Sequence, residues 1–207
     1  MATSPTSPAQ PGVPPNLTLR ERKKMLVMET IQRTALDLFD ERGFGNVTIE
    51  EVAAAAGVSP STVYRLFGSK DRLVTYDEFD RLMVEGFLGH LATMAPLAAA
   101  RATLVDLTPV INAGGNEITR RLRYMAQEPS VMAALAAETV TSGTYLGQLI
   151  AQSPGAPADA TQAALIGPIL AVTLVTALQL WYQGGCAESY AQVVARCLDL
   201  LESGLQA

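Results

Sequence analysis

The sequence contains little histidine and little cysteine, with one histidine and two cysteines in 207 residues. A single histidine, His90, excludes a histidine-rich metal site and gives a Ser-His-Asp catalytic triad no visible support. Cys186 and Cys197 belong to no CxxC motif, and on one helix they would lie about 16 Å apart along its axis, too far for a disulfide. We therefore expect buried thiols in a cytoplasmic protein, with a redox switch as the alternative, and no metal or other cofactor.

Charge is also scarce, since charged residues make up 17% of the chain and apolar residues 49%. Such a composition leaves apolar surface to spare, which predicts self-association or a ligand cavity. The acidic residues are unevenly placed. Residues 1–75 hold nine Lys and Arg against eight Asp and Glu, whereas residues 76–207 hold six against twelve. Only the first part is therefore suited to a polyanionic partner.

The N-terminus lacks the charged start and apolar stretch of a signal peptide. Residues 1–19 carry five prolines and no charged side chain, and we expect them to form a disordered tail. One uncharged stretch, 163–182, is about as long as a bilayer span. Thr173, Thr176 and Gln179 interrupt it and no Lys or Arg cluster flanks it, so we expect a buried or subunit-interface helix and no membrane contact.

The hydrophobic pattern predicts an all-α protein, because no segment alternates with a period of two over a useful length. Gly43, Gly57 and Gly68 are each placed to end a helix. We expect two domains, a small helical head over residues 20–68 and a longer helical bundle over residues 69–207. We expect helices at 19–42, 49–56, 60–67, 70–94, 98–113, 116–127, 130–152, 160–183 and 187–204.

The clearest local signals lie just after the first expected helix. Thr48 and Glu51 have the spacing of a capping box at the start of a short helix, and Ser59 followed by Pro60 starts the next one. Between them, Gly57 permits a left-handed backbone in the turn. Two short helices joined by such a turn are a helix-turn-helix, whose second helix enters the major groove of DNA.

The second helix of this motif exposes short hydroxyl side chains near its start, then a phenol and a guanidinium. Side chains at the start of a recognition helix reach base edges, while hydroxyl and basic groups bond phosphates. Lys70 is expected to open the following helix, where its ammonium and the free backbone amides would hold one phosphate, and Thr48 has a similar opportunity one helix earlier. The candidate DNA contacts are Thr48, Ser59, Ser61, Thr62, Tyr64, Arg65 and Lys70.

The segment TIEEVAAAAGVSPSTVYRLFGSKDRLV at 48–74, preceded by ALDLFDERGF at 35–44, closely resembles the DNA-binding domain of the TetR family of transcriptional regulators. The resemblance implies an all-helical homodimer. Its helix-turn-helix domain at 20–68 would bind double-stranded operator DNA, and its helical-bundle body at 69–207 would bind a small-molecule effector and dimerise. It also implies that Thr62, Tyr64 and Lys70 contact the operator. The lead-in RERKKM, followed later by FGSKDRLVTYDEFD, is similar to the actinobacterial subgroup that includes the regulator of mycofactocin genes.

The helices after residue 95 show no such resemblance, so physical criteria select the candidate residues. A long apolar helix without charge suits a dimer interface, which favours 160–183 paired with 187–204. The RRLR run at 120–123 is expected to form a solvated face, with an anionic-ligand contact as the alternative. An effector pocket needs apolar walls with a few polar groups. The candidate pocket residues are Phe87, His90, Met94, Tyr124, Met125, Tyr145 and Trp181.

These observations predict a ligand-responsive, dimeric repressor that reads a palindromic operator and releases it when an effector shifts the fourth helix. Two alternatives stay open. A helical-bundle enzyme would need paired carboxylates or a nucleophile beside a base, and the body offers only scattered acids such as Asp106, Glu117 and Glu138. A membrane-anchored regulator would depend on the stretch 163–182.

Overall fold

The computed structural model describes residues 18–77, 80–113, 115–154 and 160–204. Every regular element in these ranges is a helix, which confirms the all-α prediction. Nearly all of the predicted disordered tail, residues 1–19, lies outside the described residues. The last residue of that segment, Leu19, begins the first helix instead.

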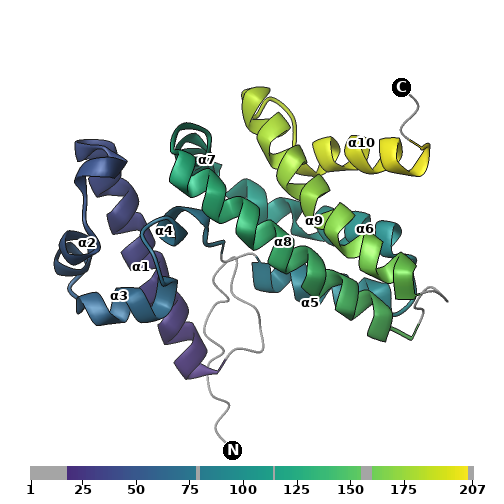
Figure 1. The fold of residues 1–207 in the computed structure, drawn as a ribbon, viewed down its shortest axis with the longest axis horizontal. Coiled ribbons are helices and arrows are strands. Elements are labelled where there is room, and N and C mark those ends of the chain that lie inside the picture. The colour runs from purple at the N-terminus through teal and green to yellow at the C-terminus, as the bar shows by residue number, and fades with distance from the viewer. Residues whose placement is uncertain (1–17, 78–79, 114, 155–159, 205–207) are drawn as a thin grey trace, which may run out of the picture.

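The head of the molecule is a compact group of short helices around one long helix (Figure 1). Its elements are α1 (Leu19–Arg42), the 3-10 turn η1 (Phe44–Asn46), α2 (Ile49–Ala55) and α3 (Pro60–Phe67). The long helix buries Ile31, Leu36 and Phe39 against the shorter ones. Thr18 and Glu21 form a capping box at its start.

The predicted helix boundaries in the head are confirmed, because the chain specifies them through its caps. Thr48 Oγ1 accepts from the Glu51 N–H at 3.2 Å, and the Glu51 carboxylate accepts from the Thr48 N–H at 2.8 Å. Ser59 caps α3 and Pro60 occupies its first turn. Gly57 has φ +68°, the left-handed backbone that the turn between α2 and α3 requires.

The predicted continuous helix over residues 70–94 is wrong. The chain instead forms a single helical turn, α4 (Arg72–Thr75), and a separate helix, α5 (Asp80–Leu91). Tyr76, which follows α4, has an extended backbone with ψ 127°. The connection between the head and the body therefore contains a break where one rigid helix was expected.

Side chains from distant helices explain this break. Gln32 Nε2 of α1 donates to Leu73 O at 3.1 Å and to Tyr76 O at 2.8 Å. Arg121 Nε, further along the chain, donates to Val74 O at 3.0 Å. These three carbonyls accept hydrogen bonds from side chains, so they do not need the backbone N–H groups that a continuing helix would provide. Sequence periodicity contains no information about such long-range partners.

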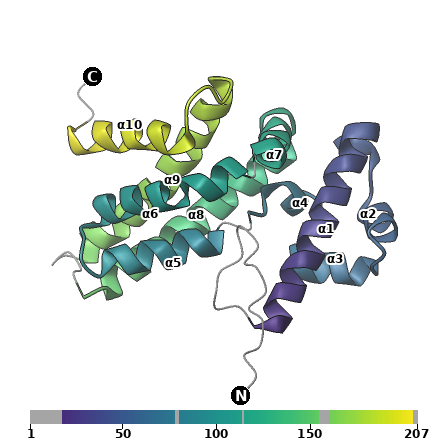
Figure 2. The same ribbon diagram turned by 180° about the vertical axis from the view of Figure 1, so that it is seen from behind.

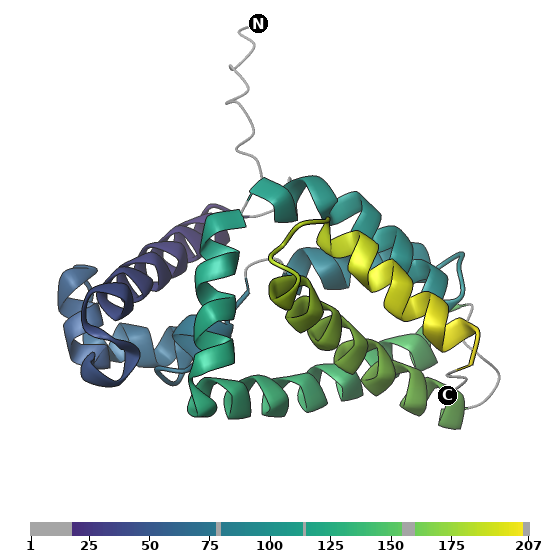
Figure 3. The ribbon, with the colours of Figure 1, turned by 90° about the horizontal axis from the view of Figure 1, so that it is seen from above.

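The body is built from α5 and the helices that follow it. These are α6 (Pro96–Ala113), α7 (Gly115–Gln127), α8 (Pro129–Gln152), α9 (Ala160–Gln183) and α10 (Tyr190–Glu202). They match the ranges expected from the sequence to within a few residues. Helix α5 lies beside α6, α8 lies beside α9, and α10 packs on α6 and α9 (Figure 2). Seen from above, α7 stands between the head and the rest of the body (Figure 3).

The α8–α9 pair packs backbone against backbone. A Cβ added at Gly167 of α9 would lie 2.2 Å from Gly147 N and 2.4 Å from Gly143 O, both on α8. A Cβ added at Gly143 would lie 2.6 Å from the Cα of Pro168. Only glycine permits such a close approach of two backbones.

The apolar stripe of α10 is used inside the subunit. Val193, Val194 and Leu198 are buried, and Tyr190 OH donates to Leu174 O of α9 at 2.8 Å. This stripe was expected to join a dimer interface together with α9. Contacts with α9 and α6 cover it instead.

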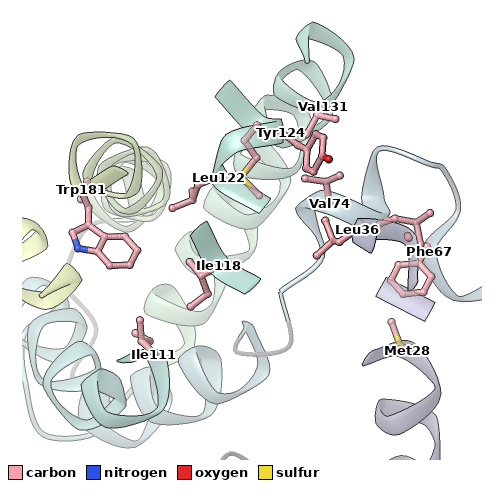
Figure 4. Packing of buried hydrophobic residues seen from close by; sticks show 14 of the residues in the cluster. Met28, Leu36, Phe67, Val74, Ile111, Ile118, Leu122, Tyr124, Val131 and Trp181 are labelled. Carbon is pink, nitrogen blue, oxygen red and sulfur yellow. The ribbon is translucent and has the colours of Figure 1, made fainter. Parts of the chain in front are cut away.

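One hydrophobic cluster runs from the head into the body (Figure 4). Met28 and Phe67 lie at its head end, Val74 and Tyr124 lie at the junction, and Trp181 lies at the body end. Protein interiors of this kind are close-packed and transmit displacement. Packed side chains therefore connect the body to the head without interruption.

Candidate functional site

The start of α3 exposes a cluster of hydroxyl groups. Ser59 Oγ accepts from the Thr62 N–H at 3.2 Å and lies 2.9 Å from both Ser61 Oγ and Thr62 Oγ1. Ser59 and Ser61 are exposed and Thr62 is half-buried. The structure thus gathers three of the predicted contact residues at one helix N-terminus, where unpaired backbone N–H groups favour an anion.

Tyr64 and Arg65 are exposed further along α3. Tyr64 OH donates to Glu50 Oε1 at 3.4 Å, and the negative charge of Glu50 raises the pKa of Tyr64 above its ordinary value. Arg65 has no ion-pair or hydrogen-bond partner for its side chain among the described residues. An exposed guanidinium without a partner can bind a phosphate or donate to the edge of a guanine.

The N-terminal half of α1 adds a basic face that the predicted contact residues do not include. Arg20, Lys23 and Lys24 of α1, with Thr62 and Arg65 of α3, line an open groove of about 720 Å³. The sequence did contain a signal, because a spacing of three and four residues places these α1 side chains on one side of a helix. Glu21 in the same run is held by Thr18, which lowers its pKa.

Cations without a partner gather at this groove. Apart from Arg20, Arg22 and Arg65, the arginines in the described ranges all lie within 4.0 Å of a carboxylate. The described Lys and Arg side chains for which no partner is found are Arg20, Arg22, Lys23, Lys24 and Arg65. The head thus carries a local positive surface on a chain whose net charge is -5.

Thr48 is exposed at the start of α2, but its hydroxyl serves the protein's own backbone. Thr48 Oγ1 donates to Glu51 Oε2 at 3.0 Å, and Arg42 Nη2 lies 2.6 Å from Glu51 Oε1. Hydrogen bonds from Thr48, assisted by Arg42, hold the pKa of Glu51 below its ordinary value. A phosphate that accepted from the Thr48 hydroxyl would replace its bond to Glu51.

Lys70 does not open a helix as predicted, since α4 begins at Arg72. Its Nζ donates to Phe44 O at 2.9 Å and to Val47 O at 3.1 Å, and it lies 4.3 Å from the centroid of the Phe44 ring. Two of the three ammonium donors are therefore used inside the head, and one is left for a phosphate. The first role of this lysine is to fix the segment between α1 and α2.

Lys70→Ala is expected to lower the free energy of unfolding of the head by about 2 kcal/mol. Two buried-facing carbonyls lose a charged donor, and the contact with the Phe44 ring is lost. Denaturant unfolding measures the effect. Lys24→Ala, which removes the same side chain from a position without partners, is the control and should stay within about 0.5 kcal/mol of wild type. Equal stabilities for the two variants would contradict the role assigned to Lys70.

The body contains a cavity of about 310 Å³, which lies at the small end of the range for small-molecule sites. Four of the predicted pocket residues line it, namely Phe87, Met125, Tyr145 and Trp181. Most of the remaining wall is aliphatic and comes from α5, α7, α8 and α9. The prediction of an apolar pocket with a few polar groups thus matches the cavity that the fold creates.

Three of the predicted pocket residues lie elsewhere. His90 Nε2 lies 2.9 Å from Asp106 Oδ2, and this pair joins α5 to α6 away from the cavity. Met94 is exposed. Tyr124 is buried at the junction of head and body, where its OH donates to Asp40 Oδ1 at 2.6 Å. Helical spacing placed these residues in the body but gave no information about which side of each helix faces the cavity.

One end of the cavity is charged, and of its charged residues only Arg121 belonged to a predicted segment, the RRLR run for which an anionic-ligand contact was the alternative. Arg121 Nη2 lies 3.1 Å from Asp77 Oδ2, and Thr75 OH donates to Glu138 Oε1 at 3.1 Å. Asp80 lines the same end. Because Thr75 and Asp77 flank the break between α4 and α5, the cavity contacts the segment that joins the head to the body. These groups meet only in the tertiary structure.

Helix α7 joins the cavity to the head. Arg120 Nη2 lies 2.7 Å from Asp37 Oδ1 and Arg120 Nε donates to Asp40 Oδ2 at 2.8 Å, while Arg123 pairs with the same aspartate. Burial opposes ionisation of Asp40, but the Tyr124 hydroxyl and the two guanidinium groups hold its pKa below the ordinary value. Arg120 and Arg123 of the RRLR run, which was expected to face solvent, are therefore bound to α1, whereas Arg121 of the same run pairs with Asp77 and lines the cavity.

Both parts of the chain match families of known proteins. Residues 31–76 match the family model of bacterial regulatory proteins of the tetR family, and residues 94–206 match the model of the MftR C-terminal domain. The putative mycofactocin biosynthesis transcriptional regulator MftR of Mycobacterium tuberculosis (strain ATCC 25618 / H37Rv) is 26% identical over 114 residues, which are 54% of this chain and 58% of that protein. The HTH-type transcriptional regulator TcmR of Streptomyces glaucescens is 34% identical over 67 residues, 32% of this chain and 30% of that one. The chain thus matches less than two thirds of the length of either relative.

Solved structures share the fold. Thermus thermophilus FadR, a TetR-family transcriptional repressor solved in complex with lauroyl-CoA, superposes with a TM-score of 0.53 at 20% identity, covering 87% of this chain and 95% of that one. NalD, the secondary repressor of the MexAB-OprM multidrug efflux pump in Pseudomonas aeruginosa, gives a TM-score of 0.53 at 16% identity, with coverages of 87% and 97%. At these identities the similarity concerns the arrangement of helices alone.

Proposed function

Because the chain belongs to the tetR family of bacterial regulatory proteins, we propose that it is a ligand-responsive, dimeric transcriptional repressor that binds a palindromic operator. The observation that carries the proposal is the group of unpaired cations around α3, on a chain whose other described arginines are paired. Neighbouring like charges repel in the free protein and are neutralised when a phosphate backbone binds. The expected resemblance to the regulator of mycofactocin genes is confirmed by the matched C-terminal domain.

The proposed interface divides between base reading and phosphate binding. Ser61 and Arg65 are exposed on α3 and Thr62 is half-buried beside them, so we assign these three side chains to base edges in a major groove. Ser59 and Tyr64 flank them as phosphate contacts. The remaining phosphate contacts are the cations of α1, with Thr48 and the third donor of Lys70 at the opposite end of the interface.

Arg65→Ala is expected to change the preferred base at one position of each half-site and to cost about 1–3 kcal/mol per half-site on the wild-type operator. Binding to duplexes mutated at single positions measures the change. Tyr64→Phe, which removes a hydroxyl from the neighbouring residue, should weaken binding to every sequence alike. A uniform loss for both variants would show that Arg65 contacts only phosphates.

Selection of bound duplexes from a random DNA pool tests the central proposal. The selection runs at about 150 mM salt with competitor DNA, because low salt favours binding that does not depend on sequence. An enriched palindrome supports the proposal and gives the half-site spacing. Retention that is equal for all sequences, and that disappears as salt rises, would count against an operator-specific repressor.

The second copy of the dimer is proposed to bind the outer side of α8 and α9. Exposed apolar residues follow α9 at helical spacing, at Leu165, Ile169, Val172 and Leu180, and Val140 of α8 is 69% exposed. These side chains lie on the side away from α10, and no charged residue interrupts them on α9. An apolar, uncharged patch of this kind is typical of a homodimer interface.

Val172→Glu is expected to convert a dimer into a monomer, because it would bury two uncompensated carboxylates at the interface. Sedimentation velocity measures the molecular mass. Leu200→Glu on α10 is the matched control, since Leu200 is 59% exposed and Val172 is 55% exposed. The control should remain dimeric. A dimer of unchanged mass in the Val172 variant would move the interface to another surface.

Helix α9 is long and apolar enough to cross a membrane, by length and composition only. Its backbone contact with α8 and the cavity residues that it supplies give it a place in a helical body. We therefore place the protein in the cytoplasm, with the exposed side of α9 covered by the second copy. Sedimentation of the expressed protein with membranes, and its release only by detergent, would instead support the membrane-anchored alternative.

The response to a ligand is proposed to pass through the break between α4 and α5. A ligand in the cavity would touch Thr75 and Asp77 of this segment directly, and Arg121 beside it donates to the backbone of Val74. The signal therefore moves a short connecting segment instead of the long fourth helix that the sequence predicted. To shift a population from 1:99 to 99:1, a ligand must prefer the released form by about 5.5 kcal/mol.

A further inference from the structure

The cavity has one apolar part and one charged end, and this polarity restricts the chemistry of its ligand. Apolar side chains form most of its wall, among them Met83, Phe87, Ile118, Leu170 and Trp181. At about 310 Å³ the space suits a compact ligand. A ligand that fills it must bury an apolar body and present its polar group to the charged end.

The charges at this end do not balance. Arg121 is 5% exposed and pairs with Asp77, and Glu138 pairs with Arg72, whose Nε lies 3.2 Å from Glu138 Oε1. Asp80 lines the cavity, is exposed to solvent on its other side, and has no side-chain partner among the described residues. The two guanidinium groups are already committed. One carboxylate is therefore left over, and the charged end is complementary to a cation.

We propose that the cavity binds a compact amphiphile with a single cationic group, a protonated amine, whose apolar body lies against Phe87 and Trp181 and whose charge pairs with Asp80. The inference rests on the proposed function, since it identifies the class of effector for the same cavity. A carboxylate or phosphate at this end would be repelled by the surplus charge of Asp80, because Arg121 and Arg72 are already paired with Asp77 and Glu138.

The state of Asp80 in the empty cavity agrees with this assignment. Desolvation and the neighbouring charge of Asp77 raise the pKa of Asp80 to about 7, with Glu138 adding to the effect and Arg121 and Arg72 opposing it. A bound cation favours the ionised carboxylate, so its affinity should rise as the pH rises through about 7. A neutral ligand with the same apolar body should show no such dependence.

The test uses the full chain and three probes of equal chain length, decylamine, decanol and decanoate, below their self-association concentrations. Trp181 is the only tryptophan and lines the cavity, so its fluorescence reports occupancy. At pH 8 the amine should bind at least about tenfold more tightly than the alcohol, and decanoate should bind most weakly. From pH 8 to pH 6 the advantage of the amine should fall by up to about tenfold, while decanol binding stays constant.

Asp80→Asn removes the proposed partner and should make the amine and the alcohol bind alike at both pH values. Asp106→Asn is the matched control, because it removes an equal charge from the exposed pair with His90, outside the cavity. It should leave the preference for the amine intact. Equal binding of amine and alcohol to the wild type, tighter binding of decanoate, or no saturable signal with any probe would overturn the inference.

Thermal unfolding shows whether Asp80→Asn folds. The folded-state pKa of Asp80 is raised above its ordinary 3.8, so the stability that its neutral form provides is complete below pH 3.8 and is lost as pH rises through about 7. Asparagine cannot ionise. The Tm of the variant should therefore exceed that of wild type by an increasing margin between pH 4 and 7. A variant that melts lower at every pH has lost packing, and the pH dependence of the wild type then decides the proposal.

Operator release is measured separately with the same probes, so that the two proposals fail in different ways. If the amine enters the cavity and the operator stays bound, the ligand class stands and the ligand-responsive function does not. If the operator is bound specifically and no probe enters the cavity, the DNA-binding function stands and the ligand class is wrong.

Discussion

Gly167→Ala is expected to destabilise the body by about 3 kcal/mol, the upper end of the usual cost of overpacking. The new methyl group would lie 2.2 Å from the Gly147 nitrogen and 2.4 Å from the Gly143 oxygen. Backbone atoms cannot rotate out of the way as a flexible side chain would. The α8–α9 pair must therefore separate, which opens the wall of the cavity and displaces the exposed side of α9. Denaturant unfolding followed by circular dichroism measures the loss.

Gly89→Ala on α5 makes the same change where nothing lies within 4 Å of the added Cβ. Alanine is the better helix former by up to about 1 kcal/mol, so this variant should be slightly more stable than wild type. If Gly167→Ala lowers the free energy of unfolding and Gly89→Ala raises it, the loss comes from the close contact between α8 and α9. A neutral result at residue 167 would show that the two helices shift apart at little cost.

Replacing Arg20, Lys23 and Lys24 together by alanine is expected to weaken operator binding by roughly a hundredfold per head, about 10⁴-fold for the dimer, at physiological salt. Each phosphate contact contributes about 0.9 to the slope of log K against log salt concentration, and three contacts per head are six per dimer, so the slope should fall by about 5.4. Because none of the three has a partner in the described structure, their removal leaves no unpaired carboxylate in the head.

Binding measured over a series of salt concentrations distinguishes phosphate contacts from damage to the head. The base preference found by duplex selection should be unchanged in the triple variant, since α3 is intact. Arg196→Ala, which removes a cation bound to Glu188 far from the head, should alter neither the slope nor the preference. An unchanged salt slope in the triple variant would place the DNA away from the groove between α1 and α3.

Much of the head was predictable because its structure depends on short-range interactions. The capping box at Thr48, the caps at Ser59 and Gly68, and the turn at Gly57 involve residues within a few positions of one another. Such signals are visible in the sequence. The hydroxyl cluster at the start of α3 follows directly from them, and so does its exposure.

The errors lie where distant residues decide the structure. The break after α4 depends on Gln32 and Arg121, which lie far along the chain in opposite directions. The role of Lys70 depends on two carbonyls that come close only when η1 folds beneath it. Asp80 entered no prediction, because its importance comes from the charges that three other segments bring to one end of the cavity.

The contact between α8 and α9 also limits how a signal can travel. The backbones of α8 and α9 are in contact at Gly143, Gly147 and Gly167, so the two helices cannot easily slide past each other. The pair therefore moves as one rigid unit. In a dimer formed through the outer side of α8 and α9, the two rigid helix pairs would fix the distance between the bodies. A ligand would then leave that distance unchanged and alter the tilt of each head at Tyr76 and Asp77. Release of the operator would then depend on the angle of each head relative to its body, while the distance between the two connecting segments stays constant.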